Sequence, residues 1–133
     1  MIAQYVRLYA DSAGESHFED IQVELSTVEL VPPAPPLNLS SLLTAEQMAF
    51  LGAPAGWASD WHTSAARNMF VVISGEWEIQ ASDGSIRRFA PNDVLLVEDT
   101  VGKGHKSDVV SNQDSLALLV QLGDLEFLRA AVR

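Results

Sequence analysis

Two of the three histidines in this chain of 133 residues lie in segments that could support proton transfer. His62 stands in WHTSAARNM, which leads into an apolar stretch, and His105 closes the segment GKGH. Histidine gains and loses protons near neutral pH, because the unperturbed pKa of its ring is about 6.5. If the fold brings both rings to one pocket, one can serve as base and the other as acid. Isomerisation, dehydration or cyclisation of a carbonyl compound needs only that equipment.

Side chains near the histidines could complete such a site. Alternate residues of a strand share a face, so Asp60, His62 and Ser64 are expected to project together, and Asp60 is a third candidate catalytic residue. The candidate substrate-binding residues are Ser64, Asn68 and Lys103 for a carbonyl oxygen or its oxyanion, Arg67 for a substrate carboxylate, and Trp57 for an apolar ligand. This set predicts a small-molecule substrate.

The segments that must position these residues are predicted to be short strands. Apolar runs and period-2 alternation favour strands near 69–74, 76–81, 86–89, 94–97 and 115–122. Asp83-Gly84 is a strong hairpin signal, Pro91-Asn92-Asp93 predicts a second turn, and Gly102-Lys103-Gly104 a third break. Many short strands at near-regular spacing predict an all-β sandwich or barrel, here at about 45–122.

The residues before and after the predicted barrel strands show less regular patterns of apolar and polar residues. A strand pair is expected at about 3–30, followed at 31–36 by a proline run that favours a stiff polyproline II connector, with a ligand for a proline-binding module as the alternative. The segment from Thr44 to Leu51 is open between a short helix, which the Thr44–Gln47 capping pattern favours, and a strand. The last segment, 123–133, is predicted to form a short helix capped by Asp124.

The spacing of Gly56, His62, Ser64, Asn68 and Gly75 resembles the first cupin motif, in which the pattern is Gly, His-x-His, Glu, Gly. The segment from Pro91-Asn92-Asp93 to His105 is similar to the second motif, with a longer loop. This resemblance implies a single-domain, double-stranded β-helix or jelly-roll barrel, commonly dimeric, with a ligand or a metal inside. It also puts both histidines in one cavity.

The same resemblance implies a weakened metal site. Ser64 stands where cupins have the second histidine and Asn68 where they have the glutamate, so two of four ligands remain. We therefore expect no cofactor. The alternative is a divalent transition metal held by His62 and His105 with Asp60, Glu98 or Asp99 as the carboxylate.

Composition excludes several partners. The net charge is −10, with 18 acidic against 8 basic residues, so the chain would be repelled by nucleic acid and by anionic membranes. There are no cysteines, and no apolar run approaches membrane-spanning length. The first residues lack the pattern of a signal peptide, so a cytoplasmic location is expected. We also expect a homodimer in which the N-terminal strand pair packs across the subunits.

These observations leave three functions open. The first is a metal-independent lyase, isomerase or cyclase that uses acid–base chemistry on a carbonyl compound. The second is a non-catalytic cupin that binds a small ligand. The third is a metal-dependent oxygenase with two histidines and one carboxylate.

Overall fold

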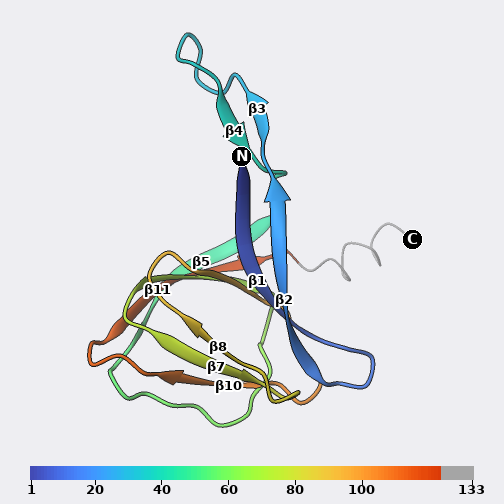
Figure 1. Cartoon of the computed structure of the whole chain (residues 1–133), viewed down its shortest axis with the longest axis vertical. Coiled ribbons are helices and arrows are strands. Elements are labelled where there is room, and N and C mark those ends of the chain that lie inside the picture. Colours follow the sequence, from blue (N-terminus) through green and yellow to red (C-terminus); the bar gives the residue numbers. More distant parts are fainter. Residues whose placement is uncertain (124–133) are drawn as a thin grey trace.

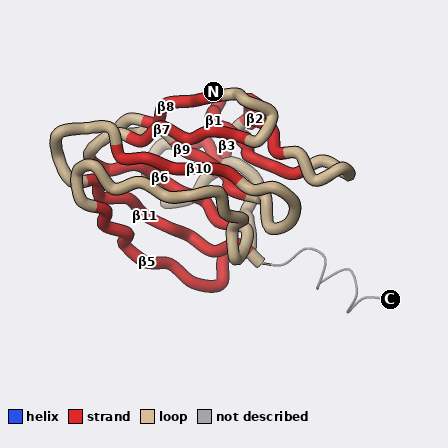
Figure 2. Tube along the Cα trace, turned by 90° about the horizontal axis from the view of Figure 1, so that it is seen from below, coloured by secondary structure: helices blue, strands red, loops and turns tan. Residues whose placement is uncertain are grey.

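The computed structural model describes residues 1–123, which form strands and connecting loops with no helix among them (Figure 2). The first five strands are β1 (Ile2–Ala10), β2 (Ser16–Glu24), β3 (Ser26–Val28), β4 (Leu37–Leu39) and β5 (Ala45–Ala53). The others are β6 (Asn68–Ser74), β7 (Trp77–Ala81), β8 (Ile86–Phe89), β9 (Val94–Val97), β10 (His105–Val109) and β11 (Ser115–Leu122).

Two sheets form the barrel. The larger sheet has six strands in the order β2-β1-β9-β6-β11-β5, and the smaller has three in the order β10-β7-β8. Neighbouring strands are antiparallel except for β1 and β9, which run parallel. Because most neighbours in the sheets are far apart in sequence, the architecture is the predicted all-β jelly roll rather than a simple meander (Figure 1).

The core lies between the two sheets. Side chains that alternate along the strands point inward from both, as the burial of Trp77, Ile79 and Ala81 on β7 shows. The buried apolar cluster consists of Leu8, Ala53, Phe70, Val72, Trp77, Ile79, Ala81, Phe89, Leu95, Val109 and Ala117. Period-2 alternation thus places one apolar face of each strand in the core.

The predicted strands of the barrel are confirmed. The prediction for 86–89, 94–97 and 115–122 matches β8, β9 and β11, and that for 69–74 and 76–81 differs from β6 and β7 by one residue each. The Asp83-Gly84 turn joins β7 to β8, with Gly84 at a φ of +93°. Strand β10, which carries His105, was not predicted, because its sequence HKSDV alternates polar types rather than apolar and polar ones.

Residues 45–53 form a strand, so the helix alternative for Thr44 to Leu51 is wrong. β5 pairs with β11 from Ala53–Ser115 to Ala45–Leu122, and it forms the edge of the larger sheet. Pairing with β11 provides hydrogen-bond partners for the backbone of this segment, although its local capping pattern favoured a helix. Tertiary pairing therefore overrides the local signal.

The proline run forms a loop and not an extended connector. It joins β3 to β4, which pair antiparallel, and the N–H of Ala34 donates to the carbonyl of Val31 at 2.9 Å. Proline cannot donate to a ladder but suits turn positions, so the chain reverses here. With the free ends of β1 and β2, this hairpin makes an arm that projects away from the barrel (Figure 1).

The predicted C-terminal helix capped by Asp124 lies outside the described residues. Within residues 1–123 there is no helix of the length and apolar character needed to cross a membrane.

Candidate functional site

A pocket of about 260 Å³ opens at the end of the barrel where the two histidines lie. Its mouth is polar and its walls are apolar. It is lined by His62, Thr63, Ser64, Ala65, Asn68, Phe70, Trp77, Ile79, Val97, His105, Ser107 and Leu119. Both sheets contribute, since Phe70, Val97 and Leu119 belong to the larger sheet and Trp77, Ile79, His105 and Ser107 to the smaller.

The two histidines are direct neighbours across a backbone pairing. The N–H of His62 donates to the carbonyl of His105 at 3.0 Å, and the N–H of His105 donates to the carbonyl of His62 at 2.9 Å. Residues paired in this way project to the same side, so the imidazole centroids lie 4.5 Å apart. The fold brings together two rings that are separated by 43 positions in sequence, and both line the pocket.

Gly104 makes this close approach possible. Its φ is +77°, and a Cβ at this position would overlap the carbonyl group of His62. Only glycine supplies both the left-handed backbone and the space. The Gly102-Lys103-Gly104 break, which the sequence marks only as a turn, is thus the element that sets His105 against His62.

His105 is held by a buried carboxylate. Its Nδ1 lies 2.5 Å from Oδ2 of Asp99, and the side chains of both residues are almost entirely inaccessible to solvent. The other carboxylate oxygen of Asp99, Oδ1, is buried without a hydrogen-bond partner. An ionised carboxylate only accepts, so beside ionised Asp99 the neutral ring of His105 carries its hydrogen on Nδ1 and keeps its lone pair on Nε2. Asp99 therefore fixes the tautomer and the orientation of the His105 ring.

His62, like His105, has a hydrogen-bond acceptor at Nδ1, but here the acceptor is neutral. Its Nδ1 lies 2.9 Å from the main-chain carbonyl oxygen of Asp60, which can only accept a hydrogen bond. Nε2 of His62 is thus also the basic nitrogen of its neutral ring. His62 is exposed at the mouth whereas His105 is buried, so the two rings differ in access to water.

Ser64 and Asn68 lie beside the histidines and bond to one another. The Ser64 hydroxyl donates to the carbonyl of Ala66 at 2.6 Å, and Nδ2 of Asn68 donates to Ser64 Oγ at 3.3 Å and to Ala66 O at 3.1 Å. The Ser64 N–H donates to the Asp99 carbonyl at 3.0 Å. These contacts lock the 64–68 loop against the strand end at Asp99.

The expectation that Asp60 projects with His62 and Ser64 is wrong for its side chain. The segment from Gly56 to Arg67 is a loop with two isolated bridges rather than a regular strand, so its side chains do not alternate. The carboxylate of Asp60 accepts from the N–H of Trp61, and its side chain does not line the pocket.

Three further candidates also lie elsewhere. Arg67 contacts Glu98 at 2.6 Å and the Gly123 carbonyl, and Lys103 pairs with Glu15 at 2.5 Å. Trp57 is exposed and packs against Trp77 with ring centroids 5.8 Å apart. None of the three lines the pocket, because each finds a closer partner.

From the sequence, Asp99 was predicted only as an alternative metal ligand and not as the partner of His105. Ser107 and the apolar walls were also missed. Asp99 is the second residue after β9 and lies three positions before Gly102, and this place near a strand end is the one local signal for it.

No protein-family model matches the chain, and no curated protein matches it in sequence. Among solved structures it is similar to a Cupin 2 conserved barrel domain protein from Salinispora arenicola, with a TM-score of 0.51 and 17% identity over 80% of this chain and 81% of that one. The chain has the cupin fold.

Two other solved structures are similar at lower scores. The cupin domain of Cnp3 from Schizosaccharomyces pombe aligns over 96% of this chain and 93% of that one, with a TM-score of 0.49 and 13% identity. A cupin superfamily protein from Desulfitobacterium hafniense aligns over 64% and 73%, with a TM-score of 0.48 and 19% identity. At such identities the likeness concerns the fold alone.

The cupin resemblance allows a metal centre as one occupant of the barrel, and the residues of this pocket do not fit one. Among residues 1–123 no group of three or more His, Cys, Asp or Glu side chains is placed to hold a metal ion. The pocket offers two imidazole nitrogens, while transition ions require three or four ligands. Asp99 already binds Nδ1 of His105, and Asp60 and Glu98 do not line the pocket.

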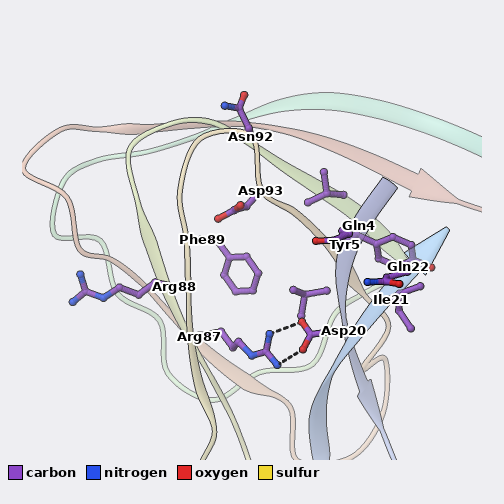
Figure 3. A pocket seen from close by; sticks show the side chains of 12 residues that line it. Gln4, Tyr5, Asp20, Ile21, Gln22, Arg87, Arg88, Phe89, Asn92 and Asp93 are labelled. Atoms are coloured by element: carbon purple, nitrogen blue, oxygen red, sulfur yellow. Dashed lines mark hydrogen bonds and ion pairs between the residues drawn. The ribbon is translucent and has the colours of Figure 1, made fainter. Parts of the chain in front are cut away.

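A larger pocket, of about 580 Å³, lies at the seam between β2 and β8, the edge strands of the two sheets (Figure 3). Arg87 and Asp20 form a bidentate ion pair across this seam, with Nη1–Oδ1 at 2.7 Å and Nη2–Oδ2 at 3.0 Å. No histidine lines this pocket among the described residues. Its charged pair serves to hold the two sheets together.

Proposed function

We propose that the histidine pocket binds a small carbonyl compound and moves a proton at the carbon next to the carbonyl, without a metal. The observation that supports this most directly is the buried Asp99–His105 pair, which lies in a pocket that also contains His62. Among residues 1–123, nothing hydrogen-bonds to Nε2 of His105. A base, its orienting carboxylate and a second proton carrier are the parts that general acid–base catalysis needs.

His105 is the base in this scheme. Nε2 accepts the proton as the C–H bond breaks, and the electron pair of that bond moves toward the carbonyl oxygen. Asp99 keeps Nδ1–H in place and stabilises the imidazolium that forms. Because Asp99 is shielded from water, its charge acts on the ring at low local dielectric.

His62 is the acid. In its protonated form Nε2–H donates to the carbonyl oxygen and so stabilises the negative charge that develops there. Its exposed position at the mouth lets it exchange protons with water between turnovers. Ser64 and Asn68 hold the 64–68 loop in place and do not donate to the substrate, since their hydrogen-bond donors are already engaged within this loop.

The test is hydrogen–deuterium exchange of acetophenone and cyclohexanone in D₂O, followed by proton NMR. We expect exchange next to the carbonyl to exceed that in heat-denatured protein, and to persist in EDTA. His62→Ala and His105→Ala should each lower the rate roughly a hundred- to ten-thousand-fold, as far as the background allows. Absence of exchange with both ketones, or exchange abolished by EDTA and restored by iron, manganese or zinc, would overturn the proposal.

Asp99→Asn tests the orienting role of the carboxylate. The amide fills the same space but can present an N–H to the ring, which favours the tautomer with hydrogen on Nε2. We expect a loss of roughly a hundredfold in exchange rate at little cost in melting temperature. The ¹⁵N shifts of the His105 ring should report the tautomer change. An unchanged tautomer together with an unchanged rate would contradict this role.

A further inference from the structure

We infer that the histidine pocket selects neutral, ring-containing carbonyl compounds of roughly ten non-hydrogen atoms and rejects carboxylates and phosphates. The inference rests on the proposed function for the carbonyl group. Its other parts come from the size, the walls and the charge of the pocket.

The volume sets the size of the ligand. An apolar cavity of about 150 Å³ is large enough for benzene, so a pocket of 260 Å³ has room for a ring with a few substituent atoms. Drug-sized ligands occupy pockets of about 300–1,000 Å³, which makes this one small.

The walls favour a flat apolar ring. Phe70 and Trp77 meet edge to face at an interplanar angle of 87°, with centroids 5.4 Å apart. The indole nitrogen of Trp77 is bound to Ser115 Oγ at 2.6 Å, so the indole has no donor left for a ligand. Ile79, Val97 and Leu119 complete the apolar lining, and the polar groups gather at the histidine end.

The charge of the site excludes anions. Of the residues that the structure describes, no lysine or arginine lines this pocket. Lys106, next to His105 in sequence, places its Nζ over the ring of Trp61 at 5.9 Å from the centroid. Arg67 and Lys103 are paired with Glu98 and Glu15. When His105 takes a proton, the charge of Asp99 beside it cancels the gain. While the His62 ring is neutral, an anion would therefore lose its water without gaining a counter-charge, in a chain of net charge −10.

The experiment compares benzamide with benzoate, which match in shape and in number of non-hydrogen atoms but differ in charge. Binding is followed at pH 8 by the NMR shifts of the Trp77 indole N–H and the histidine rings. We expect benzamide and acetophenone to shift these signals, and benzoate to bind at least tenfold more weakly. Equal or tighter binding of benzoate, or no binding of either neutral compound, would overturn the inference.

Two matched variants locate the binding. Ala65 lines the mouth of the pocket and is exposed, whereas the exposed Ala13 lies on the β1–β2 turn. Ala65→Trp should abolish the shifts by closing the mouth, and Ala13→Trp should leave them unchanged. Shifts that persist in Ala65→Trp would place the binding elsewhere and overturn the inference.

The outcomes separate this inference from the proposed function. Selective benzamide binding without deuterium exchange would leave the ligand class standing and remove the chemistry. Exchange of a ketone together with tight benzoate binding would support the chemistry and overturn the proposed ligand class. His105→Ala should lose exchange but keep the preference for benzamide, since the apolar walls and the absence of a lining lysine or arginine remain.

Discussion

The three histidines differ in what holds their ring nitrogens, and this decides what each can do. His105 has one carboxylate on Nδ1 and His62 has a main-chain carbonyl on Nδ1, and neither Nε2 is hydrogen-bonded to a residue of 1–123. His17 instead has a carboxylate on each nitrogen, Asp11 at 2.7 Å from Nε2 and Asp83 at 3.0 Å from Nδ1. Two carboxylates can be satisfied together only by a ring with two N–H groups, so His17 favours the imidazolium form.

This cluster ties the β1–β2 turn to the β7–β8 turn in a pH-dependent way. The hydrogen bond with Asp11 raises the pKa of His17 above its ordinary 6.5, and the bond with Asp83 acts in the same direction. The bond with His17 likewise lowers the pKa of Asp11 below 3.8. Because the pKa of His17 is raised in the folded state, its stabilisation is complete below pH 6.5 and is lost as pH rises through the folded-state pKa. The stabilisation from the lowered pKa of Asp11 is complete above pH 3.8 and is lost as pH falls through the folded-state pKa of Asp11.

We predict that His17→Gln lowers the melting temperature most between about pH 4 and 6.5, because the charged pairs are then complete. The difference between wild type and variant should shrink as pH rises above the histidine range. Thermal unfolding measured at pH 5.5 and pH 9 checks this. A difference of the same size at both values would show that the charge of His17 plays no part.

At the scale of elements, the loop from Thr100 to Gly104 sets the geometry of the site. Gly102 and Gly104 both have positive φ, and a side chain on Gly102 would overlap the Gly14 backbone just as one on Gly104 would overlap His62. The loop therefore packs against both the β1–β2 turn and the His62 segment. Gly102 and Gly104 are therefore needed for the close backbone contacts with Gly14 and His62 as well as for the turn itself.

We predict that Gly104→Ala lowers the activity by separating His62 from His105. Gly84→Ala is the matched control, because Gly84 also has positive φ but has open space at the Cβ position. Gly84→Ala should cost roughly 1–2 kcal/mol of stability through backbone strain alone. Gly104→Ala should cost more and should lower the exchange rate at least tenfold.

Denaturant unfolding and the deuterium exchange assay measure the two effects. Equal stabilities and equal rates in the two variants would mean that the close approach at Gly104 is not required.

For the molecule as a whole, one group of exposed apolar side chains lies on the arm that projects from the barrel (Figure 1). The arm formed by β3, β4 and the free ends of β1 and β2 carries exposed Leu30, Val31 and Leu37. β1 pairs with β9 only from Val6 to Leu8, so its first residues pair with β2 alone. A two-stranded sheet is marginally stable in water by itself, and exposed apolar patches mark interaction surfaces.

We predict a homodimer in which this arm packs against a second copy. Light scattering at micromolar concentration should give twice the mass of the chain. Leu30→Glu combined with Leu37→Glu should shift the mass to that of a monomer, because burying two carboxylates in an apolar contact is unfavourable. Ile86→Glu, at an exposed apolar position on β8, should leave the dimer intact. A monomeric wild type would contradict the prediction.

The sequence by itself determined the strands of the barrel, because their signals are local. Alternation along β7 and the Asp83-Gly84 turn act within a few residues, and no distant partner is needed to interpret them. The spacing around His62 and the distant His105 also sufficed to place both in a cupin-like frame. What this spacing could not supply was the direction of each side chain in the irregular 56–67 loop.

Only the tertiary structure decided which charges reach the pocket. Arg67 and Lys103 look available in sequence, but Glu98 and Glu15 lie 31 and 88 positions away from them and become their neighbours through the sheet pairing. Asp60 and Asp99 are both acidic residues near a histidine in sequence, yet one meets solvent and the other is buried against His105. The choice depends on burial and on partners that only the folded barrel brings together, since an ion pair forms between whichever charges the packing leaves adjacent.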